Sequence, residues 1–107
     1  MKTPHKDDFN IEYELVFSPQ AEQQLYEILM YLSEHAGSFI ANKLLQRIFD
    51  NIEHLKHYPK LGRMRDDLNV REIFPENYRV VYEINEDLNQ IQIITIIHSR
   101  MLYPRPH

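Results

Sequence analysis

The stretch YRVVYEINEDLNQIQIITIIH, residues 78–98, contains two apolar runs separated by a short polar segment. In residues 78–84 the side chains alternate, which indicates a β-strand with one buried face. Residues 91–98 are apolar on both faces, which is typical of a strand inside a sheet. Residues 85–89 are rich in Asn and Asp and predict a turn. The stretch therefore predicts two consecutive strands, the second lying in the interior of a sheet.

The N-terminal part of the chain predicts a strand followed by a helix. Residues 11–17 alternate between apolar and acidic side chains, as in a strand with one wet face. Ser18 and Pro19 then supply a helix N-cap and a first helical residue whose missing N–H costs nothing. Over residues 20–35 apolar side chains recur at helical spacing, and Gly37 follows where a helix would end.

A second helix is predicted immediately after Gly37, with Ser38 as its cap and Pro59 as its stop. Because the turn between the helices is very short, they should form an antiparallel hairpin. The apolar stripe of this helix consists of Ala41, Leu44, Leu45, Ile48, Ile52 and Leu55.

Residues 60–69 are expected to form a loop, and residues 70–74 a short strand. The element order β-α-α-β-β-β predicts an α+β fold. The helical hairpin would pack on one face of a mainly antiparallel four-stranded sheet. We expect residues 11–107 to form a single domain and residues 1–10 to form a flexible tail.

Two helices cover only one face of such a sheet, and this leaves the second face to be explained. Strict alternation would place Ile91, Ile93 and Ile97 on one face and Ile94 and Ile96 on the other. The second apolar face then needs a cover. The C-terminal segment, a second copy of the chain or a partner protein could supply it.

Composition excludes several classes of protein. The 107 residues contain no Cys, which rules out disulfide scaffolds and thiolate metal sites. A net charge of −4 argues against a generally basic nucleic-acid binder, so no direct nucleic-acid binding is expected. The longest strongly apolar run, residues 93–97, is too short to span a membrane, and the polar first residues do not resemble a signal peptide. We therefore expect a cytoplasmic protein without a cofactor.

Basic residues are concentrated in residues 56–79, which makes this region a candidate binding surface. Arg63, which follows Gly62, is expected either to bind an acidic surface or to hold the turn through carbonyl groups. Arg71 and Arg79 are placed on neighbouring strands and are expected to lie side by side. Adjacent like charges need a bridging acid, which could be Glu72, Glu83 or a partner's carboxylate.

The C-terminal region supplies the remaining candidate residues. His98 is the natural candidate for a general acid or base, and the competing interpretation is a structural histidine at the sheet edge. Arg100 and Tyr103 are residue types favoured at protein interfaces. His54 and His57 are three residues apart, but no third metal ligand can be named, so no metal site is predicted.

Taken in order, these segments resemble the RelE/ParE superfamily of toxins from type II toxin–antitoxin modules, and the ParE branch in particular. The resemblance extends from Glu12 to Arg100. It is carried by the order and spacing of Ser18-Pro19-Gln20-Ala21, Leu25, Ile28, Tyr31, Ala41, Ile48, Leu55, Pro59, Leu61-Gly62-Arg63, Val70-Arg71, Tyr78-Arg79-Val80-Val81-Tyr82 and His98-Ser99-Arg100.

The resemblance implies a cytoplasmic toxin that a cognate antitoxin neutralises, with a toxin–antitoxin heterotetramer as a plausible assembly. ParE-like toxins are associated with inhibition of DNA gyrase and a block of replication, whereas RelE-like toxins cleave messenger RNA on the ribosome. The target- or antitoxin-binding residues would be Arg63, Arg71, Arg79, Arg100 and Tyr103.

The residues favour the gyrase interpretation over RNA cleavage. Metal-free RNA cleavage needs a base, an acid and cations around the phosphate, for which Arg79, His98 and Arg100 are the candidates. The lysines that RNA-cleaving members carry on the second strand are absent, and Glu72 in that stretch would repel phosphate. The alternatives are a RelE-type ribonuclease and a decayed toxin that acts only as an antitoxin-binding module.

Overall fold

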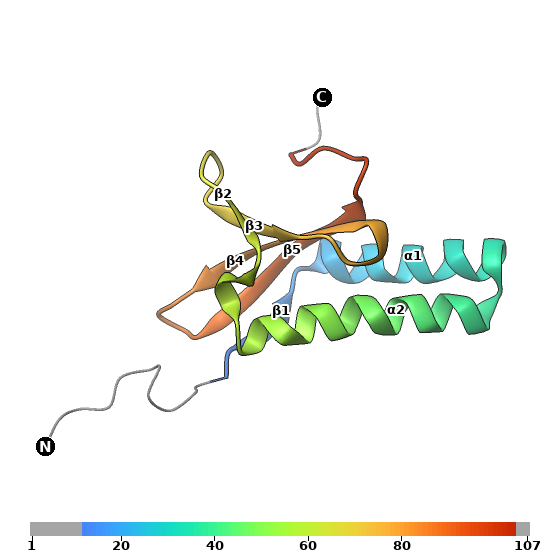
Figure 1. The fold of residues 1–107 in the computed structure, drawn as a ribbon, viewed down its shortest axis with the longest axis horizontal. Helices are drawn as coiled ribbons and strands as arrows, with labels where there is room; N and C mark the ends of the chain where they lie inside the picture. The colour runs from blue at the N-terminus through green and yellow to red at the C-terminus, as the bar shows by residue number, and fades with distance from the viewer. Residues whose placement is uncertain (1–11, 105–107) are drawn as a thin grey trace, which may run out of the picture.

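Two helices lie against one face of a five-stranded sheet in the computed structural model, which describes residues 12–104 (Figure 1). The predicted tail, residues 1–10, and the first residue of the predicted strand, Ile11, lie outside the described residues. The main elements are β1 (Glu14–Phe17), α1 (Pro19–Ala36), α2 (Ser38–Glu53), β2 (Arg63–Arg65), β3 (Val70–Ile73), β4 (Tyr78–Asn85) and β5 (Gln90–His98). Short 3₁₀ turns η2 (His54–Lys56), η3 (Pro59–Leu61) and η4 (Pro75–Asn77) connect them.

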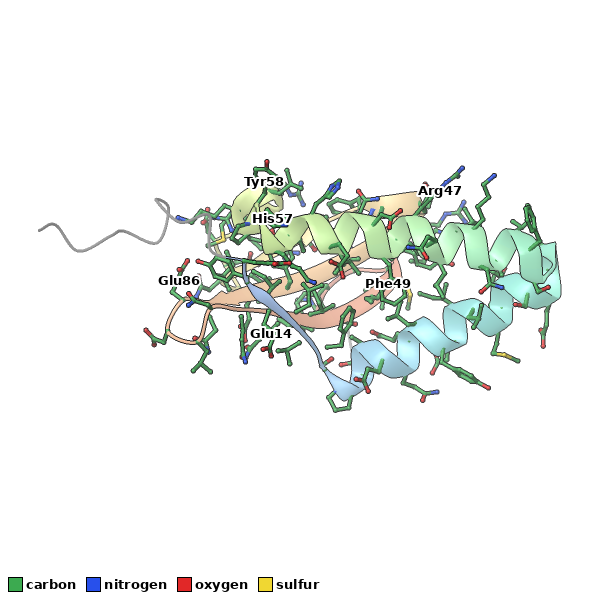
Figure 2. The ribbon with its side chains drawn as sticks, turned by 90° about the horizontal axis from the view of Figure 1, so that it is seen from below. Glu14, Arg47, Phe49, His57, Tyr58 and Glu86 are labelled. Atoms are coloured by element: carbon green, nitrogen blue, oxygen red, sulfur yellow. The ribbon has the colours of Figure 1, made fainter. Side chains whose placement is uncertain are left out.

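The strand order is β1-β5-β4-β3-β2, with β1 parallel to β5 and all other neighbours antiparallel. This confirms the α+β fold with a mainly antiparallel sheet. It also confirms that β5 is an interior strand, because β1 and β4 pair with its two edges. The helices lie together on one side of the sheet, and α1 and α2 are antiparallel neighbours (Figures 1 and 2).

The prediction of a four-stranded sheet is wrong by one strand. The expected loop, residues 60–69, contains β2, which forms a hairpin with β3 in the register Arg63↔Glu72 and Arg65↔Val70. Three residues are too few for a recognisable alternation. Pairing with β3 stabilises β2, and the hairpin is closed by a turn in which Asn69 has a positive φ of 54°.

The start of the first helix was predicted correctly, and the start of the second was not. The Ser18 hydroxyl oxygen accepts a hydrogen bond from the Ala21 N–H at 3.0 Å, and Pro19 is the first helical residue. Gly37, with a φ of 87°, ends α1 and is itself the N-cap of α2. Ser38 is therefore already helical and makes no capping hydrogen bond. The α-helix ends at Glu53, before Pro59, which instead opens η3.

The core between the hairpin and the sheet is organised around Tyr82. Its side chain is fully buried together with Ile48, Ile52 and Leu55 of the α2 region and with Ile91, Ile93 and Ile96 of β5. The Tyr82 hydroxyl donates to the Pro59 carbonyl at 2.6 Å and accepts from the Gly62 N–H at 2.8 Å. A Cβ at Gly62 would lie 2.6 Å from this hydroxyl oxygen, so the close approach requires glycine.

A β-bulge changes which isoleucines face the core. Val81 pairs with Thr95 but Tyr82 pairs with Ile93, so Ile94 is an extra residue on β5. Beyond it, Ile96 joins Ile91 and Ile93 in the core on the helix side. Ile97, opposite Arg79, faces the other side of the sheet. The expected assignment of Ile96 and Ile97 is therefore reversed, because strict alternation does not allow for a bulge.

Replacing Tyr82 with phenylalanine should destabilise the protein by about 1–3 kcal/mol, because the buried Gly62 N–H loses its acceptor. Tyr58→Phe, at a residue 66% exposed, is the matched control and should leave the stability near that of the parent. Urea unfolding of the three proteins measures the difference. Equal stability of Tyr82→Phe and the parent would show that the hydroxyl is unimportant to the fold.

The stabilities of Tyr82→Phe and Tyr58→Phe should depend differently on pH under alkaline conditions. Burial raises the pKa of the Tyr82 phenol above its ordinary value of 10.0. Its contribution to stability is complete below that value and is lost as the pH rises through the folded-state pKa. We expect unfolding curves between pH 9 and 11 to show a shallower loss of stability in Tyr82→Phe than in Tyr58→Phe.

Candidate functional site

A buried carboxylate on the second sheet face, on the strand next to the edge strand β2, binds three arginines. Glu72 of β3 has a fully buried side chain, and its Oε2 is 2.6 Å from the Arg79 guanidinium and 3.4 Å from that of Arg65. Its Oε1 is 3.3 Å from Arg63. The strand registers Arg63↔Glu72 and Glu72↔Val81 place these residues on the face away from the helices. We call Glu72, Arg63, Arg65 and Arg79 the arginine cluster.

Arg79 connects the cluster to the C-terminal segment. Besides Glu72, its guanidinium donates to the Met101 carbonyl at 3.1 Å and to the Ser99 carbonyl at 3.2 Å. It also lies 4.9 Å from the centre of the Phe74 ring, a distance typical of a cation–π contact. Most of the hydrogen-bonding capacity of this side chain is thus used within the protein.

Arg65 makes a second connection to the C-terminal segment, donating to the Tyr103 carbonyl at 3.1 Å. Its other donors bind Asp67, whose pKa this hydrogen bond lowers from the ordinary value of 3.8. The same hydrogen bond raises the pKa of Arg65, with Glu72 acting in the same direction. The C-terminal segment, one of the expected covers for the second face, therefore lies against it and is held through main-chain carbonyls.

Arg63 is the exposed member of the cluster, with 69% of its side chain accessible to solvent. It lies 5.9 Å from the Phe74 ring centre, and Phe74 is itself 45% exposed. An exposed guanidinium beside an exposed aromatic ring is suited to contact with an acidic protein surface. Arg63 binds Glu72, so the expected alternative that it holds the turn carbonyls is not what the structure shows.

Arg71 fills that role instead. It donates to the Gly62 carbonyl at 2.9 Å and to the Lys60 carbonyl at 3.3 Å. Because Arg71 pairs with the core residue Tyr82, it lies on the helix face, whereas Arg79 lies on the second face. The expectation that Arg71 and Arg79 lie side by side is therefore wrong. The four residues from Phe74 to Asn77 reverse the chain between β3 and β4, and the resulting strand register places Arg71 and Arg79 on opposite faces.

His98 lies near the end of β5 opposite Tyr78 and forms an edge-to-face ring pair with it at 5.7 Å. Its Nδ1 accepts the Arg100 backbone N–H at 3.2 Å. These contacts match the structural interpretation of the histidine. Arg100 is exposed, and Tyr103 is half-buried with its carbonyl bound to Arg65.

Glu72 and Arg65 are the site residues that sequence reasoning undervalued. In the sequence, Glu72 is one of several acids that could bridge the arginines, and nothing in the local pattern distinguishes Arg65. The hairpin of β2 and β3 aligns Arg63 and Arg65 with the face of Glu72, but a three-residue strand such as β2 has no recognisable sequence pattern. Within residues 12–104, no group of three or more potential metal-ligating side chains gathers. Neither helix of this described part is long and apolar enough to cross a membrane.

Solved structures share this fold. The chain superposes on the chromosomal ParDE toxin–antitoxin system of P. aeruginosa with a TM-score of 0.71 and 20% identity, covering 83% of this chain and 97% of that one. The RelBE2 toxin–antitoxin complex of Mycobacterium tuberculosis gives a TM-score of 0.63 at 17% identity, covering 82% of this chain and 99% of the other. The E. coli RelBE complex gives 0.58 at 16% identity, covering 80% and 95%. At these identities the likeness shows the fold alone.

Family membership comes from the sequence itself. Residues 15–103 match the model of the ParE toxin of the type II toxin–antitoxin system parDE. The chain therefore belongs to the ParE toxin family of type II toxin–antitoxin systems, within the RelE/ParE superfamily. No curated protein gives a significant match.

Replacing Glu72 with glutamine should destabilise the protein by roughly 3–5 kcal/mol, because the partly buried guanidiniums of Arg65 and Arg79 lose their counter-charge. Asp67→Asn changes a carboxylate that also pairs with Arg65 but is largely exposed, and should leave the unfolding midpoint close to that of the parent. Denaturant unfolding followed by circular dichroism compares them. Similar midpoints for both variants would contradict a central role for Glu72.

Proposed function

We propose that this protein is a toxin that a cognate antitoxin neutralises and that acts by inhibiting DNA gyrase, thereby blocking replication. The observation that carries the choice of target is the engagement of Arg79. Its guanidinium binds the Glu72 carboxylate and two main-chain carbonyls, so it has little capacity left for a scissile phosphate.

The electrostatics of the face support the same conclusion. A fully buried carboxylate lies between the three arginines, where phosphodiester cleavage would need uncompensated positive charge. The overall charge of −4 also argues against docking on ribosomal RNA, because neutralising phosphates supplies much of the affinity for nucleic acids. His98, whose Nδ1 accepts a backbone N–H, is not in contact with the cluster through any described bond.

The accessible groups of this region are suited to protein recognition. Arg63 and Phe74 are exposed next to each other, and Leu102 of the C-terminal segment is 64% exposed. Arginine and aromatic side chains are the residue types enriched at protein interfaces. We propose that Arg63, with Arg100 and Tyr103 nearby in the chain's C-terminal segment, contacts an acidic surface of the target or of the antitoxin.

The proposal of an antitoxin partner rests on the family and on the assemblies of similar fold. The P. aeruginosa structure is a ParDE system, and the M. tuberculosis and E. coli structures are RelBE toxin–antitoxin complexes. By analogy, we infer a complex between this chain and a cognate antitoxin, with a heterotetramer as the assembly to test by mass photometry.

The target is tested by incubating the purified protein with gyrase and relaxed plasmid. We expect inhibited supercoiling and accumulated DNA breaks, both reversed by the antitoxin. Arg63→Ala should weaken inhibition by roughly fivefold or more, as loss of an interface hot spot does. Arg47→Ala removes a half-exposed arginine from α2 and should have little effect on the inhibition of gyrase.

The competing functions give different results. Cleavage of messenger RNA on ribosomes that disappears in Arg100→Ala would support a RelE-type ribonuclease and contradict the proposal. A folded protein that binds its antitoxin but neither inhibits gyrase nor arrests growth would be an antitoxin-binding module only.

A further inference from the structure

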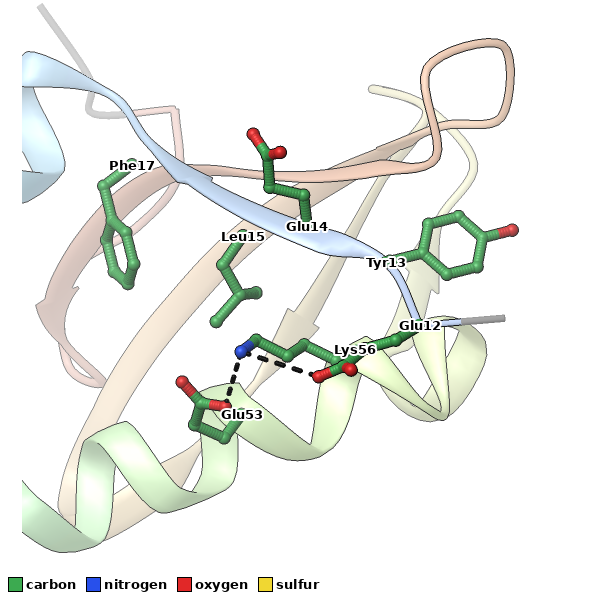
Figure 3. A pocket seen from close by; sticks show the side chains of 7 residues that line it. All are labelled: Glu12, Tyr13, Glu14, Leu15, Phe17, Glu53 and Lys56. Atoms are coloured by element: carbon green, nitrogen blue, oxygen red, sulfur yellow. Dashed lines mark ion pairs between the residues drawn. The ribbon is translucent and has the colours of Figure 1, made fainter. Parts of the chain in front are cut away.

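A groove opens at the opposite edge of the sheet from the arginine cluster. It lies between the edge strand β1 and the end of α2, has a volume of 520 Å³ and is drawn in Figure 3. Leu15 and Phe17 of β1 line its apolar part, and Phe17 packs on Phe49 of α2 at 6.1 Å between ring centres. None of the family-derived site residues belongs to this groove.

Along this groove, the backbone of Leu15 and Phe17 offers hydrogen bonds to another strand, whereas the N–H of Tyr13 already donates to the Lys56 carbonyl at 3.0 Å. The Glu14 N–H donates to the carbonyl of Asn89, just before β5, and the Ser18 N–H donates to the carbonyl of Ile93 within β5. Because successive residues of a strand direct their backbone groups to opposite edges, those of Leu15 and Phe17 face outward. In the described sheet β1 is an edge strand, and the outward edge of these two residues has no strand partner.

The charges around this edge select the partner. Glu12, Glu14 and Glu53 line the groove with a single cation, Lys56. Lys56 pairs with Glu53 at 2.9 Å and with Glu12 at 3.7 Å, and its pKa is raised chiefly by Glu53 (Figure 3). The groove therefore carries a net negative charge. The Glu14 side chain points to the opposite side of β1 from that of Leu15 (Figure 3).

We propose that β1 binds an extended segment of a partner protein in which lysine or arginine alternates with aliphatic residues. The segment would add to the sheet as an antiparallel strand. Directly opposed residues of antiparallel strands share a face, so its aliphatic side chains would enter the groove beside Leu15 and Phe17. Its basic residues would lie on the other face and pair with Glu14.

A second copy of the chain is a poorer occupant. Two β1 strands joined edge to edge would bring their own acidic residues together, and like charges across a strand pair are destabilising. The inference does not depend on the toxin's target, because this edge and β2 lie at opposite ends of the strand order. A partner on β1 leaves the arginine cluster free to contact another protein.

The experiment uses the full-length protein and a blocked synthetic peptide that alternates valine and lysine. Binding should slow the amide hydrogen exchange of Leu15 and Phe17 by roughly tenfold or more, as new strand pairing does. The Glu14 amide, which is already bonded to Asn89, should change little. A peptide that alternates valine and glutamate should not bind.

Two backbone-modified peptides test the orientation of the added strand. In an antiparallel addition the valines face β1 with their backbone groups, so N-methylation of the valines should abolish binding. N-methylation of the lysines, which face away, should preserve it. The reverse result, or equal binding of both peptides, would overturn antiparallel addition.

Two protein variants test the charge complementarity without disturbing the core. Glu14→Lys should weaken binding of the valine–lysine peptide roughly threefold to tenfold, because an attractive cross-strand pair becomes repulsive. Glu34→Lys, at an exposed position near the end of α1, is the matched control and should not change the affinity. Equal affinities of the two variants would contradict the assigned role of Glu14.

The remaining outcomes identify other occupants. Binding of neither peptide would mean that this edge only protects against aggregation, which would overturn the proposal. Concentration-dependent dimerisation that protects Leu15 and Phe17 would assign the edge to a second copy. Tighter peptide binding after deletion of residues 1–11, which contain Lys2 and Lys6, would assign it to the chain's own N-terminal segment.

Discussion

The second face of the sheet depends on the contact between the buried Glu72 carboxylate and its arginines. Burying one carboxylate alone would be strongly unfavourable, and three guanidiniums without it would repel one another. Together they allow β2, β3 and β4 to bring four charged side chains close to one another on this face, beside the apolar residues Val81 and Ile97. Arg65 and Arg79 then fix the C-terminal segment by binding its main-chain carbonyls.

In this arrangement, the basic residues Arg65 and Arg79 stabilise the fold through their contacts with Glu72 and the C-terminal segment. Arg79 looks like a phosphate ligand in the sequence, but in the fold it holds a carboxylate and two carbonyls. Arg63, bound to the same carboxylate yet largely exposed, keeps a side available for a partner. Within one cluster, burial thus separates the mostly buried Arg65 and Arg79, which hold the C-terminal segment, from the exposed Arg63.

The two ends of the strand order have different characters. At β2 the exposed chemistry is that of arginine beside an aromatic ring, whereas at β1 it is an open backbone edge beside carboxylates. The helical hairpin covers one face of the sheet and packs on a core that contains Tyr82. The Tyr82 hydroxyl accepts a hydrogen bond from the Gly62 N–H and so connects β4 to the turn at that glycine. The two edges of the sheet therefore present chemically different surfaces.

Local patterns in the sequence determined the α+β class, the start of α1 at Ser18-Pro19, the break at Gly37 and the interior position of β5. Each depends on periodicity or on the conformational preferences of neighbouring residues, which act over a few positions. Only the tertiary structure decided that β2 exists, that Ile96 rather than Ile97 faces the core, and that Arg71 and Arg79 lie on opposite faces. Strand pairing, a bulge and the register between β3 and β4 set these features. They also bring Glu72 to three arginines from two other strands. The sequence alone does not reveal this cluster, because a buried charge is stabilised by partners that are distant in sequence.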